Sequence, residues 1–367
     1  MPGRCLCAPI VGAATLALAL LVPPAPVLAA RPAGDRAAPP TASGAAPSPP
    51  ASVLAAAPAE PLQAFVLAGA PDSFADLQAH VAQIGVIYPT YFRCAVPGGA
   101  VLGAPEPVLD AYSAAHDLAE LPRFTCQDGA TVRRILSDPA LRAQTLAQLT
   151  ALAGDPAYRG LNLDLENAGS RSREALSAFV AALAARLHAE HRQLTVDVVG
   201  VEREDPRHAS YLYDDRVLAA AADAVFVMAW GIHWERSAPG PLAPLPYVRA
   251  VARRLAALPD AWRFVLGVPL YGLDWAGRGG GPIRPAQALQ YAGVTALAAA
   301  VGAAPVRDSV SGEMTFAYLR AGVAHRVWYL DGSAVAQRVA IARRYGLSAG
   351  VWRLGEEDQD VWTEHGV

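Results

Sequence analysis

The chain contains no lysine. All 30 of its basic side chains are arginines, spread along 367 residues against 33 acidic side chains, for a formal net charge of −3. No segment gathers these arginines into a basic stripe, which argues against nucleic acid as a partner. The chain also lacks a glycine-rich phosphate-binding fingerprint after its first predicted strand, which argues against a dinucleotide-binding fold.

Long apolar runs are scarce as well, and the one near the N-terminus has the layout of a targeting segment. Arg4 supplies a basic start, residues 8–22 form an apolar run, and residues 27–29 provide a small-residue cleavage signal. The run is short and bounded by prolines, which disfavours a membrane span and leaves an uncleaved anchor as the alternative. We predict a signal peptide over residues 1–29, an exported protein, and no membrane contact after cleavage.

Cysteine is rare, and two of the four cysteines, Cys5 and Cys7, lie in the predicted signal peptide. Cys94 and Cys126 remain, and each ends a strand-like run. Strands that are consecutive in a barrel bring such ends close enough for a disulfide in an oxidising compartment. We predict a disulfide between them, with two buried thiols as the alternative. No histidine accompanies either cysteine at ligand spacing, so we expect no metal site.

Residues 30–61 consist mostly of alanine, proline, serine and glycine and show no periodic apolar face. Such a composition cannot bury a core and predicts an extended, disordered linker. The folded part is therefore expected over residues 62–367.

In the folded part, strand-like runs alternate with helical patterns. The predicted strands are 64–67, 86–92, 120–126, 160–166, 194–201, 224–230, 264–268 and 348–352, and the longest helical patterns are 131–152 and 170–190. About eight β-then-α units predict an α/β fold whose parallel sheet closes into a (β/α)8 TIM barrel. An open doubly wound sheet is the alternative.

The stretch after the seventh predicted strand is longer than a βα loop requires. Residues 274–331 hold a helix-like run (285–302) and two strand-like pieces (313–320 and 325–329). We predict that they form a small α+β subdomain, inserted between the seventh strand and the seventh helix, where it would deepen a groove at the barrel rim.

The fourth predicted strand, GLNLDLE, has an unusual alternation. Its leucines fall on one face, whereas Asn162, Asp164 and Glu166 fall on the other. A parallel strand between helices is normally apolar on both faces, and burying carboxylates costs free energy unless that face opens onto a site. In a (β/α)8 barrel, the carboxyl ends of the strands form the active site.

Asp164 and Glu166 lie two residues apart on a strand, so their carboxyls point the same way. A neighbouring carboxylate and a dry barrel mouth both favour keeping one of them protonated at neutral pH, as a general acid for glycosidic cleavage requires. The alternative is a structural role, in which the two residues cap helices or pair with an arginine.

The segment resembles the DxxDxDxE signature of glycoside hydrolase family 18, which includes chitinases and spore-cortex peptidoglycan hydrolases. Arg159 and Asn162 stand at its first and second Asp, Asp164 at its third, and Glu166 at its Glu. Three further motifs resemble those of the sixth, seventh and eighth strands and occur in the family's order, namely VMAW (227–230), GVPLYG (267–272) and GVWRLG (350–355). The run 314–331 resembles the end of the family's inserted subdomain.

The resemblance implies a retaining, substrate-assisted mechanism on N-acetylated amino sugars, without cofactor or metal. Glu166 would be the acid and base, and Asp164 would orient the substrate's acetamido group. Trp352 would form the floor of the subsite for the distorted sugar. The remaining substrate-binding candidates are Asn162, which would hydrogen-bond Asp164, together with Tyr91, Asp197, Trp230, His233 and Tyr271. Among the other tryptophans, Trp328 and Trp362 are expected in the core, and Trp234 and Trp275 in either the groove or the core.

Trp230 and Gly231 depart from the family pattern, because they replace its Tyr and Asp. The main prediction is an exported glycosidase that cleaves β-1,4 links in chitin-like or peptidoglycan glycans. One alternative is a non-catalytic glycan-binding barrel, and another is an exported barrel whose resemblance is coincidental. No wall-binding repeat accompanies the barrel to choose between chitin and peptidoglycan, and nothing requires more than a monomer.

Overall fold

The computed structural model describes residues 60–278, 281–282 and 284–363. The predicted signal peptide lies outside the described residues, as does the predicted linker up to residue 59. In the described part, no helix is both long and apolar enough to cross a membrane.

The main sheet is a closed barrel with eight strand positions, of which the second and third are each split in two. In chain order the strands are β1 (Leu62–Val66), β2 (Ile84–Pro89) with β3 (Phe92–Cys94), β5 (Ala119–Glu120) with β6 (Arg123–Cys126), β7 (Gly160–Leu165), β8 (Gln193–Val199), β9 (Ala224–Met228), β10 (Phe264–Pro269) and β17 (Ser348–Trp352). The ring closes because β2 pairs with β5, and β3 pairs with β6. The predicted (β/α)8 barrel is therefore confirmed.

Prolines explain the two split strands. Pro89 ends β2, and Pro122 separates β5 from β6. Proline has no backbone N–H to donate to the ladder, so the strand is interrupted where it occurs. After the first interruption, β3 forms a short antiparallel hairpin with β4 (Val101–Gly103).

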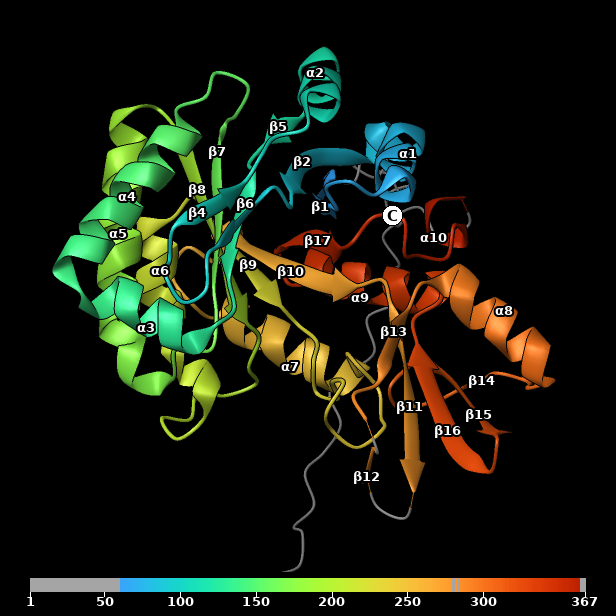
Figure 1. Cartoon of the computed structure of the whole chain (residues 1–367). Helices are drawn as coiled ribbons and strands as arrows, with labels where there is room; N and C mark the ends of the chain where they lie inside the picture. The colour runs from blue at the N-terminus through green and yellow to red at the C-terminus, as the bar shows by residue number, and fades with distance from the viewer. Residues whose placement is uncertain (1–59, 279–280, 283, 364–367) are drawn as a thin grey trace, which may run out of the picture. The chain divides into compact units, whose positions relative to one another are not determined.

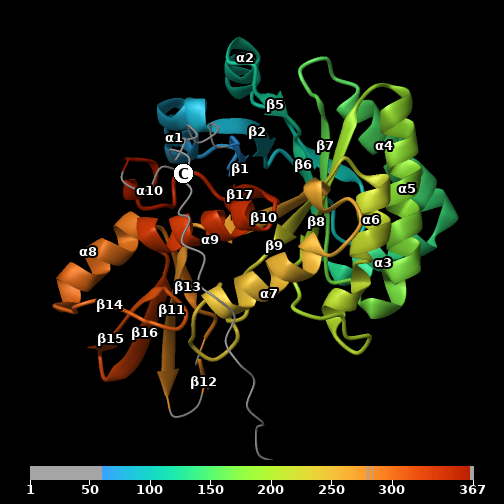
Figure 2. The ribbon, with the colours of Figure 1, turned by 180° about the vertical axis from the view of Figure 1, so that it is seen from behind.

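Helices surround the barrel on its outer side (Figures 1 and 2). They are α1 (Pro71–His80), α2 (Pro107–Ala115), α3 (Gly129–Ser137), α4 (Pro139–Ala153), α5 (Arg173–Ala189), α6 (Asp215–Ala221), α7 (Leu245–Ala256), α9 (Gly332–Arg344) and α10 (Asp360–Thr363). Short 3-10 turns precede or follow several strands and helices, namely η1 (Val81–Gln83), η2 (Ser170–Ser172), η3 (Ala209–Leu212) and η4 (Ala261–Arg263).

Two helix predictions are corrected. The pattern over 131–152 forms two helices, because Pro139 cannot continue α3 and instead begins α4. The Asp138 side chain caps the new helix by accepting from the Ala140 and Leu141 N–H groups (2.9 and 3.1 Å). The helix-like run over 285–302 becomes a short strand, β13 (Gln287–Leu289), followed by α8 (Tyr291–Val301).

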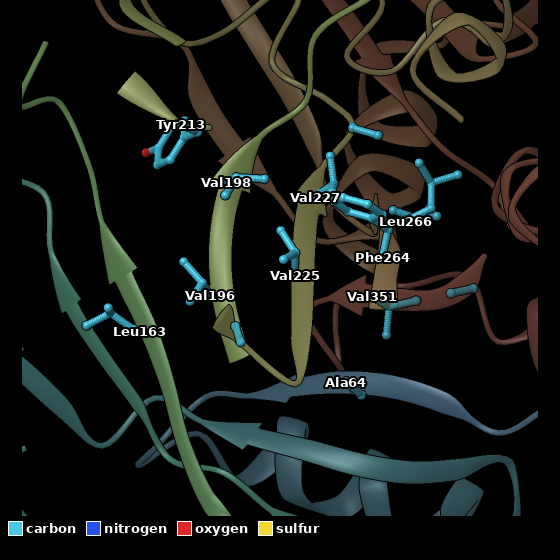
Figure 3. Close-up of a cluster of buried hydrophobic side chains, with 14 of the residues drawn as sticks. Ala64, Leu163, Val196, Val198, Tyr213, Val225, Val227, Phe264, Leu266 and Val351 are labelled. Carbon is cyan, nitrogen blue, oxygen red and sulfur yellow. The ribbon is translucent and has the colours of Figure 1, made fainter. Parts of the chain in front are cut away.

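The core lies between the barrel wall and the helices. Alternate residues of the strands point outward into it, and Figure 3 shows Leu163, Val196, Val198, Val225 and Val227 among them, all buried. The intervening residues point into the barrel. There, Phe65, Tyr88 and Phe226 pack ring against ring, with ring centres 4.9–6.0 Å apart.

The long interval after β10 folds into the predicted α+β insertion. Besides α8 and β13, it contains β11 (Gly272–Arg278), β12 (Gly281–Pro282), β14 (Val306–Arg307), β15 (Met314–Arg320) and β16 (Val323–Tyr329), in a mainly antiparallel sheet. Figure 1 shows it beside the barrel. Inside it, Asp274 accepts a hydrogen bond from the Tyr318 hydroxyl (2.6 Å) and lies 2.9 Å from His325 Nδ1.

A buried ion pair ties this insertion to the barrel. Glu313 accepts from the backbone N–H groups of Leu242 and Ala243 (2.8 and 2.7 Å), which lie in the segment between β9 and α7. Arg338 of α9 donates to Glu313 (3.3 Å) and to the Ala243 and Ser311 carbonyls. Because neither side chain is exposed, each charge depends on these partners.

Candidate active site

The alternation predicted for GLNLDLE is present in β7. Its leucines face the helices, whereas Asn162 and Asp164 are fully buried on the inner side of the barrel. Glu166 follows directly after the strand and is half-buried. The polar face therefore ends at the carboxyl edge of the barrel, where strand ends and loops can contact a substrate.

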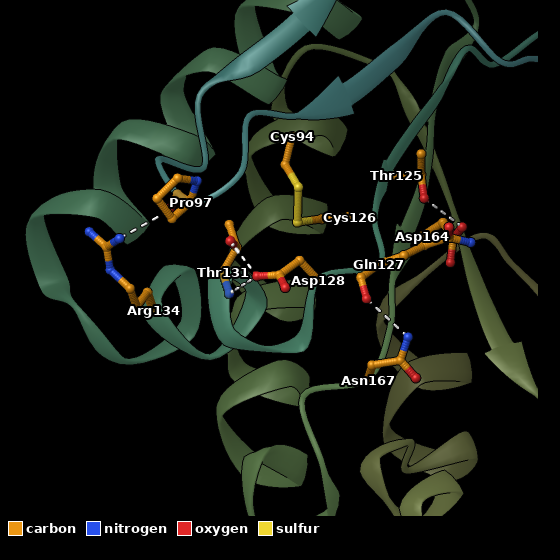
Figure 4. The surroundings of a disulfide bond; sticks show 10 residues. All are labelled: Cys94, Pro97, Thr125, Cys126, Gln127, Asp128, Thr131, Arg134, Asp164 and Asn167. Carbon is orange, nitrogen blue, oxygen red and sulfur yellow. Dashed lines mark hydrogen bonds between the residues drawn. A yellow bond between two sulfur atoms is a disulfide. The ribbon is translucent and has the colours of Figure 1, made fainter.

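Asp164 is held by two side chains of the neighbouring strand. Its Oδ2 accepts from Arg123 Nη2 and from the Thr125 hydroxyl (2.9 Å), as Figure 4 shows for Thr125. The parallel register explains both contacts, because β6 places Thr125 beside Asp164 and Arg123 two residues earlier on the same face. Asp164 Oδ1 has no hydrogen-bond partner among the described residues. That oxygen is itself buried.

Glu166 is held at the edge of the barrel by the end of β6. Its backbone N–H donates to the Cys126 carbonyl (2.9 Å), and Gln127 Nε2 donates to its Oε1 (2.7 Å). Burial and the nearby negative charge of Asp164 raise the pKa of Glu166 to about 7, although Gln127 and Arg123 act in the opposite direction. The carboxyl is thus poised to give and take a proton near neutral pH.

The structure corrects the predicted contact between Asn162 and Asp164. The Asn162 amide instead donates to Asp197 Oδ1 (2.7 Å), on the next strand, β8. Pairing of Asn162 with Thr195 places Asp197 farther along β8 and still on the inner face, within reach of the amide. Burial and the charge of Asp164 raise the pKa of Asp197 well above its usual range.

A cavity of about 470 Å³ opens above these side chains. This volume lies within the range of small-molecule sites. Its lining includes five of the predicted residues, Glu166, Asp197, Trp230, Tyr271 and Trp352, together with Phe65, Arg123, Gln127, Trp234 and Glu235. Asp164 and Asn162 lie behind this wall.

The aromatic side of the cavity is built on the barrel interior. The Trp352 ring lies 5.0 Å from that of Phe65, and Trp230 packs against Phe226 with ring centres 6.3 Å apart. Gly267 makes room for these rings, because a Cβ there would lie 2.5 Å from Phe226 and 2.7 Å from Trp230. Flat apolar rings of this kind pack against the C–H faces of sugars.

Two of the predicted substrate-binding residues, Tyr91 and His233, lie outside the cavity. Tyr91 sits between β2 and β3, where Pro89 has ended the strand; it is buried, and its hydroxyl donates to Asp110 (2.8 Å). His233 is turned into its own loop, where Nδ1 donates to the Ala238 carbonyl (2.9 Å) and the ring covers Gly240. Neither residue lines the cavity.

The structure also decides between groove and core for the other tryptophans. Trp234 is 50% exposed and lines the cavity, whereas Trp275 is fully buried and donates to the Trp234 carbonyl (3.2 Å). Trp362 packs in the core, as predicted, and Trp328 is partly buried and packs against it.

Arg123, Thr125 and Gln127 are site residues that the sequence analysis missed. All three belong to the third strand position or follow it directly, and they contact Asp164 or Glu166. A signal was present, since RFTCQ places polar side chains at alternate positions just as GLNLDLE does. In the part of the chain that the structure describes, no cluster of three or more His, Cys, Asp or Glu side chains is arranged to hold a metal ion.

A (β/α)8 barrel with a buried Asp and a half-buried Glu at the end of its fourth strand has the arrangement expected of a glycoside hydrolase. The chain belongs to glycosyl hydrolases family 18, whose family model matches residues 127–357.

Relatives and solved structures agree with this family. The uncharacterized glycosylase YvbX of Bacillus subtilis is 26% identical over 238 residues, which cover 64% of this chain and 68% of that protein. YdhD of the same organism, named as a sporulation-specific glycosylase, is 28% identical over 228 residues, or 61% of this chain and about half (53%) of that protein. A chitinase from Chromobacterium violaceum is structurally similar, with a TM-score of 0.74, 26% identity, and coverage of 83% of this chain and 97% of that one.

Proposed function

We propose that the protein is an exported, retaining glycosidase that cleaves β-1,4 links next to N-acetylated amino sugars, in chitin-like or peptidoglycan glycans. The observation that carries this proposal is the placement of Glu166. It lines the cavity, is held by Gln127, and has a pKa raised to about 7, with Asp164 on the same face. The resemblance to a chitinase and to bacterial glycosylases supports the substrate class.

In the proposed mechanism, the substrate supplies its own nucleophile. Glu166 protonates the leaving glycosidic oxygen, and the carbonyl oxygen of the substrate's 2-acetamido group attacks the anomeric carbon, which gives an oxazolinium ion. Asp164 orients the acetamide N–H, which requires its buried Oδ1 to turn into the cavity, and offsets the developing positive charge. Glu166, now ionised, then takes a proton from the water that opens the oxazolinium ion, so that configuration is retained.

The replacements at Trp230 and Gly231 alter the environment of the acetamide carbonyl. Trp230 and Tyr271 both line the cavity, so an indole N–H or a phenol hydroxyl is available to that oxygen in place of the family's tyrosine. Gly231 has a φ of +84°, a conformation that an aspartate side chain rarely adopts.

The first test is reducing-end release by the full chain from chitooligosaccharides and from purified peptidoglycan. Glu166→Gln keeps the shape of the side chain and removes the acid, so we expect a loss of roughly 10²–10⁴-fold in turnover with binding retained. Glu174→Gln, on the exposed side of α5, is the matched control and should leave turnover unchanged.

The outcomes separate the candidate functions. Turnover of one glycan that disappears only in Glu166→Gln establishes the glycosidase and its substrate class. Turnover that survives in Glu166→Gln contradicts the assigned acid. Binding without turnover on both glycans would favour a glycan-binding barrel, a function consistent with the departures at Trp230 and Gly231.

Export is tested separately. If residues 1–29 are removed on secretion, the mature chain begins at Ala30, and N-terminal sequencing of protein recovered outside the cell reads that residue first.

A further inference from the structure

Arg123 occupies an unusual place for a charged side chain. It lies on β6, points into the barrel beside Asn162 of β7, and is only 8% exposed. Its small exposed part faces the cavity. Placing a guanidinium in a barrel interior costs desolvation energy, so its retention requires strong compensating contacts.

Those contacts join the two halves of the site. On one edge, the guanidinium donates to Asp164 Oδ2, and its Nε lies 3.9 Å from Asp197 Oδ2. On its face, the central carbon lies 4.9 Å from the Trp352 ring centre and 5.8 Å from that of Phe65, within cation–π range. One side chain thus contacts both the carboxyls and the aromatic floor.

The charge balance depends on this one cation. Asp164, Glu166 and Asp197 form a cluster of three carboxyls around the inner end of the cavity, and every salt bridge to the cluster in the described part of the chain comes from Arg123. The other groups around the cluster include one further acid on the cavity wall, Glu235. The rest are hydrogen-bonding side chains without a formal charge, namely Tyr88, Thr125, Gln127, Asn162, Tyr213 and Tyr271.

We propose that Arg123 is a positioning residue of this glycosidase. It fixes the Asp164 carboxyl beneath the substrate, holds Trp352 in place as the floor, and balances the charge of the carboxyl cluster. The inference rests on the proposed function for its kinetic consequences, whereas the effect on the carboxyl cluster is a property of the free protein.

The physical consequence of removing Arg123 has a definite sign. Without the cation, three carboxyls share a poorly solvated space, and each ionisation becomes less favourable. Coupled groups release their protons in steps that belong to the cluster rather than to one residue. The last proton should therefore leave the cluster at a higher pH, by about one unit or more.

The decisive experiment is a carbon NMR titration of the Asp and Glu carboxyl groups in the full, ligand-free protein. Glu166→Gln assigns the Glu166 signal. Arg123→Met and Arg123→Gln remove the charge, and either one that folds suffices, while Arg123→Lys keeps the charge without the planar fork. The matched control is Arg254→Met, which breaks a similarly buried pair with Asp215 on the outer helices.

We expect the cluster to titrate about one pH unit higher in the uncharged variants, near the wild-type range in Arg123→Lys, and unchanged in Arg254→Met. A folded, uncharged variant with the wild-type titration would overturn the proposal. If neither uncharged variant folds, Arg123→Lys decides the question by comparison with an unrelated core variant. Should both variants shift the titration of the cluster by the same amount, the shift would reflect general destabilisation, and the proposal would be overturned.

Kinetics supply a second readout on whichever glycan is turned over. The alkaline limb of kcat/KM should move upward with the titration in Arg123→Gln, and kcat should fall in Arg123→Lys because the fork that orients Asp164 and stacks on Trp352 is lost. Failure of the proposed function would show as absent turnover in the wild type, with the NMR result still deciding the role of Arg123.

Discussion

At the scale of single residues, the site separates two carboxyls by their surroundings. Asp164 is fully buried and accepts hydrogen bonds from a guanidinium and a hydroxyl. Glu166 is less buried but has only a neutral amide as its side-chain partner. Two acids on one face of one strand therefore have different surroundings, and only Glu166 lines the cavity, where it can exchange a proton with a substrate.

The raised pKa of Glu166 predicts the alkaline limb of the pH profile. Because the first step needs the protonated acid, kcat/KM should be highest below about pH 7 and fall tenfold for each pH unit above it. Measuring kcat/KM between pH 5 and 9 checks this. An activity that stays constant up to pH 9 would contradict the assigned acid.

The indole at position 230 can be tested against the family's phenol. If Trp230 only replaces the hydrogen bond of that tyrosine, Trp230→Tyr should show equal or higher kcat. Trp230→Phe is the matched control, because phenylalanine has the ring of tyrosine without its hydroxyl. Its kcat should be roughly 10-fold or more below that of Trp230→Tyr. Complete loss of activity in Trp230→Tyr would show that the loop has been rebuilt around the larger ring.

How far the sequence predicts the site depends on how local each signal is. The alternation in β7 correctly placed Asn162, Asp164 and Glu166, because side-chain direction in a strand follows from position alone. The partner of Asn162 was predicted wrongly, since it depends on the register of β8. Tyr91 and His233 were misplaced because a proline break and a loop closing on itself leave no periodic signal.

At the scale of elements, the sequence predicts which strands and helices exist and in what order, but it predicts only some of the breaks within them. The eight strand positions follow from apolar runs between helical patterns, and the insertion follows from an interval too long for a loop. The splits at Pro89 and Pro122 and the break at Pro139 moved boundaries by a few residues. The sequence contains these prolines, yet whether a proline ends an element or begins the next is decided by its neighbours.

The short strand β5 carries a buried acid with consequences for stability. Both carboxyl oxygens of Glu120 lack a hydrogen-bond partner among the residues that the structure describes. Burial, assisted by the charge of Asp110, raises the pKa of Glu120 from 4.5 to about 8. The folded protein therefore binds this proton more tightly than the unfolded chain does.

This shift predicts a pH-dependent free energy of unfolding. The contribution of Glu120 is complete below about pH 4.5 and is lost as the pH rises through 8, by on the order of 5 kcal/mol. Glu120→Gln should remove that part of the slope in urea unfolding measured from pH 5 to 9. The exposed Glu174→Gln is the control, and an equal slope in both variants would contradict the assignment.

At the scale of the whole molecule, the insertion and the barrel share one buried ion pair. Glu313 in the insertion and Arg338 in α9 are both fully buried, and between them they hold the segment that follows β9 and carries Trp234. The cavity wall is thus positioned from outside the barrel. Sequence patterns mark neither residue, because each is an ordinary charged side chain until the long-range contact forms.

Breaking this pair should destabilise the whole fold. Arg338→Met leaves Glu313 buried without its cation, so we expect a loss of about 3–5 kcal/mol in the free energy of unfolding. Arg207→Met removes an arginine from a solvent-exposed pair with Asp205 and should cost much less. Denaturant unfolding of both variants measures the difference, and similar losses would contradict the structural role of the buried pair.

The barrel is closed along the line where β2 meets β5 and β3 meets β6. The predicted Cys94–Cys126 disulfide, whose Cα atoms lie 5.1 Å apart, would join β3 to β6 at one end of this line, and the buried Glu120 carboxyl lies near the other. If the line separates, the closed ring becomes an open sheet with two free edges, whose unpaired N–H and C=O groups can pair with another chain. Reducing and alkaline conditions weaken both ends of this line together, so self-association through strand edges should begin under those conditions.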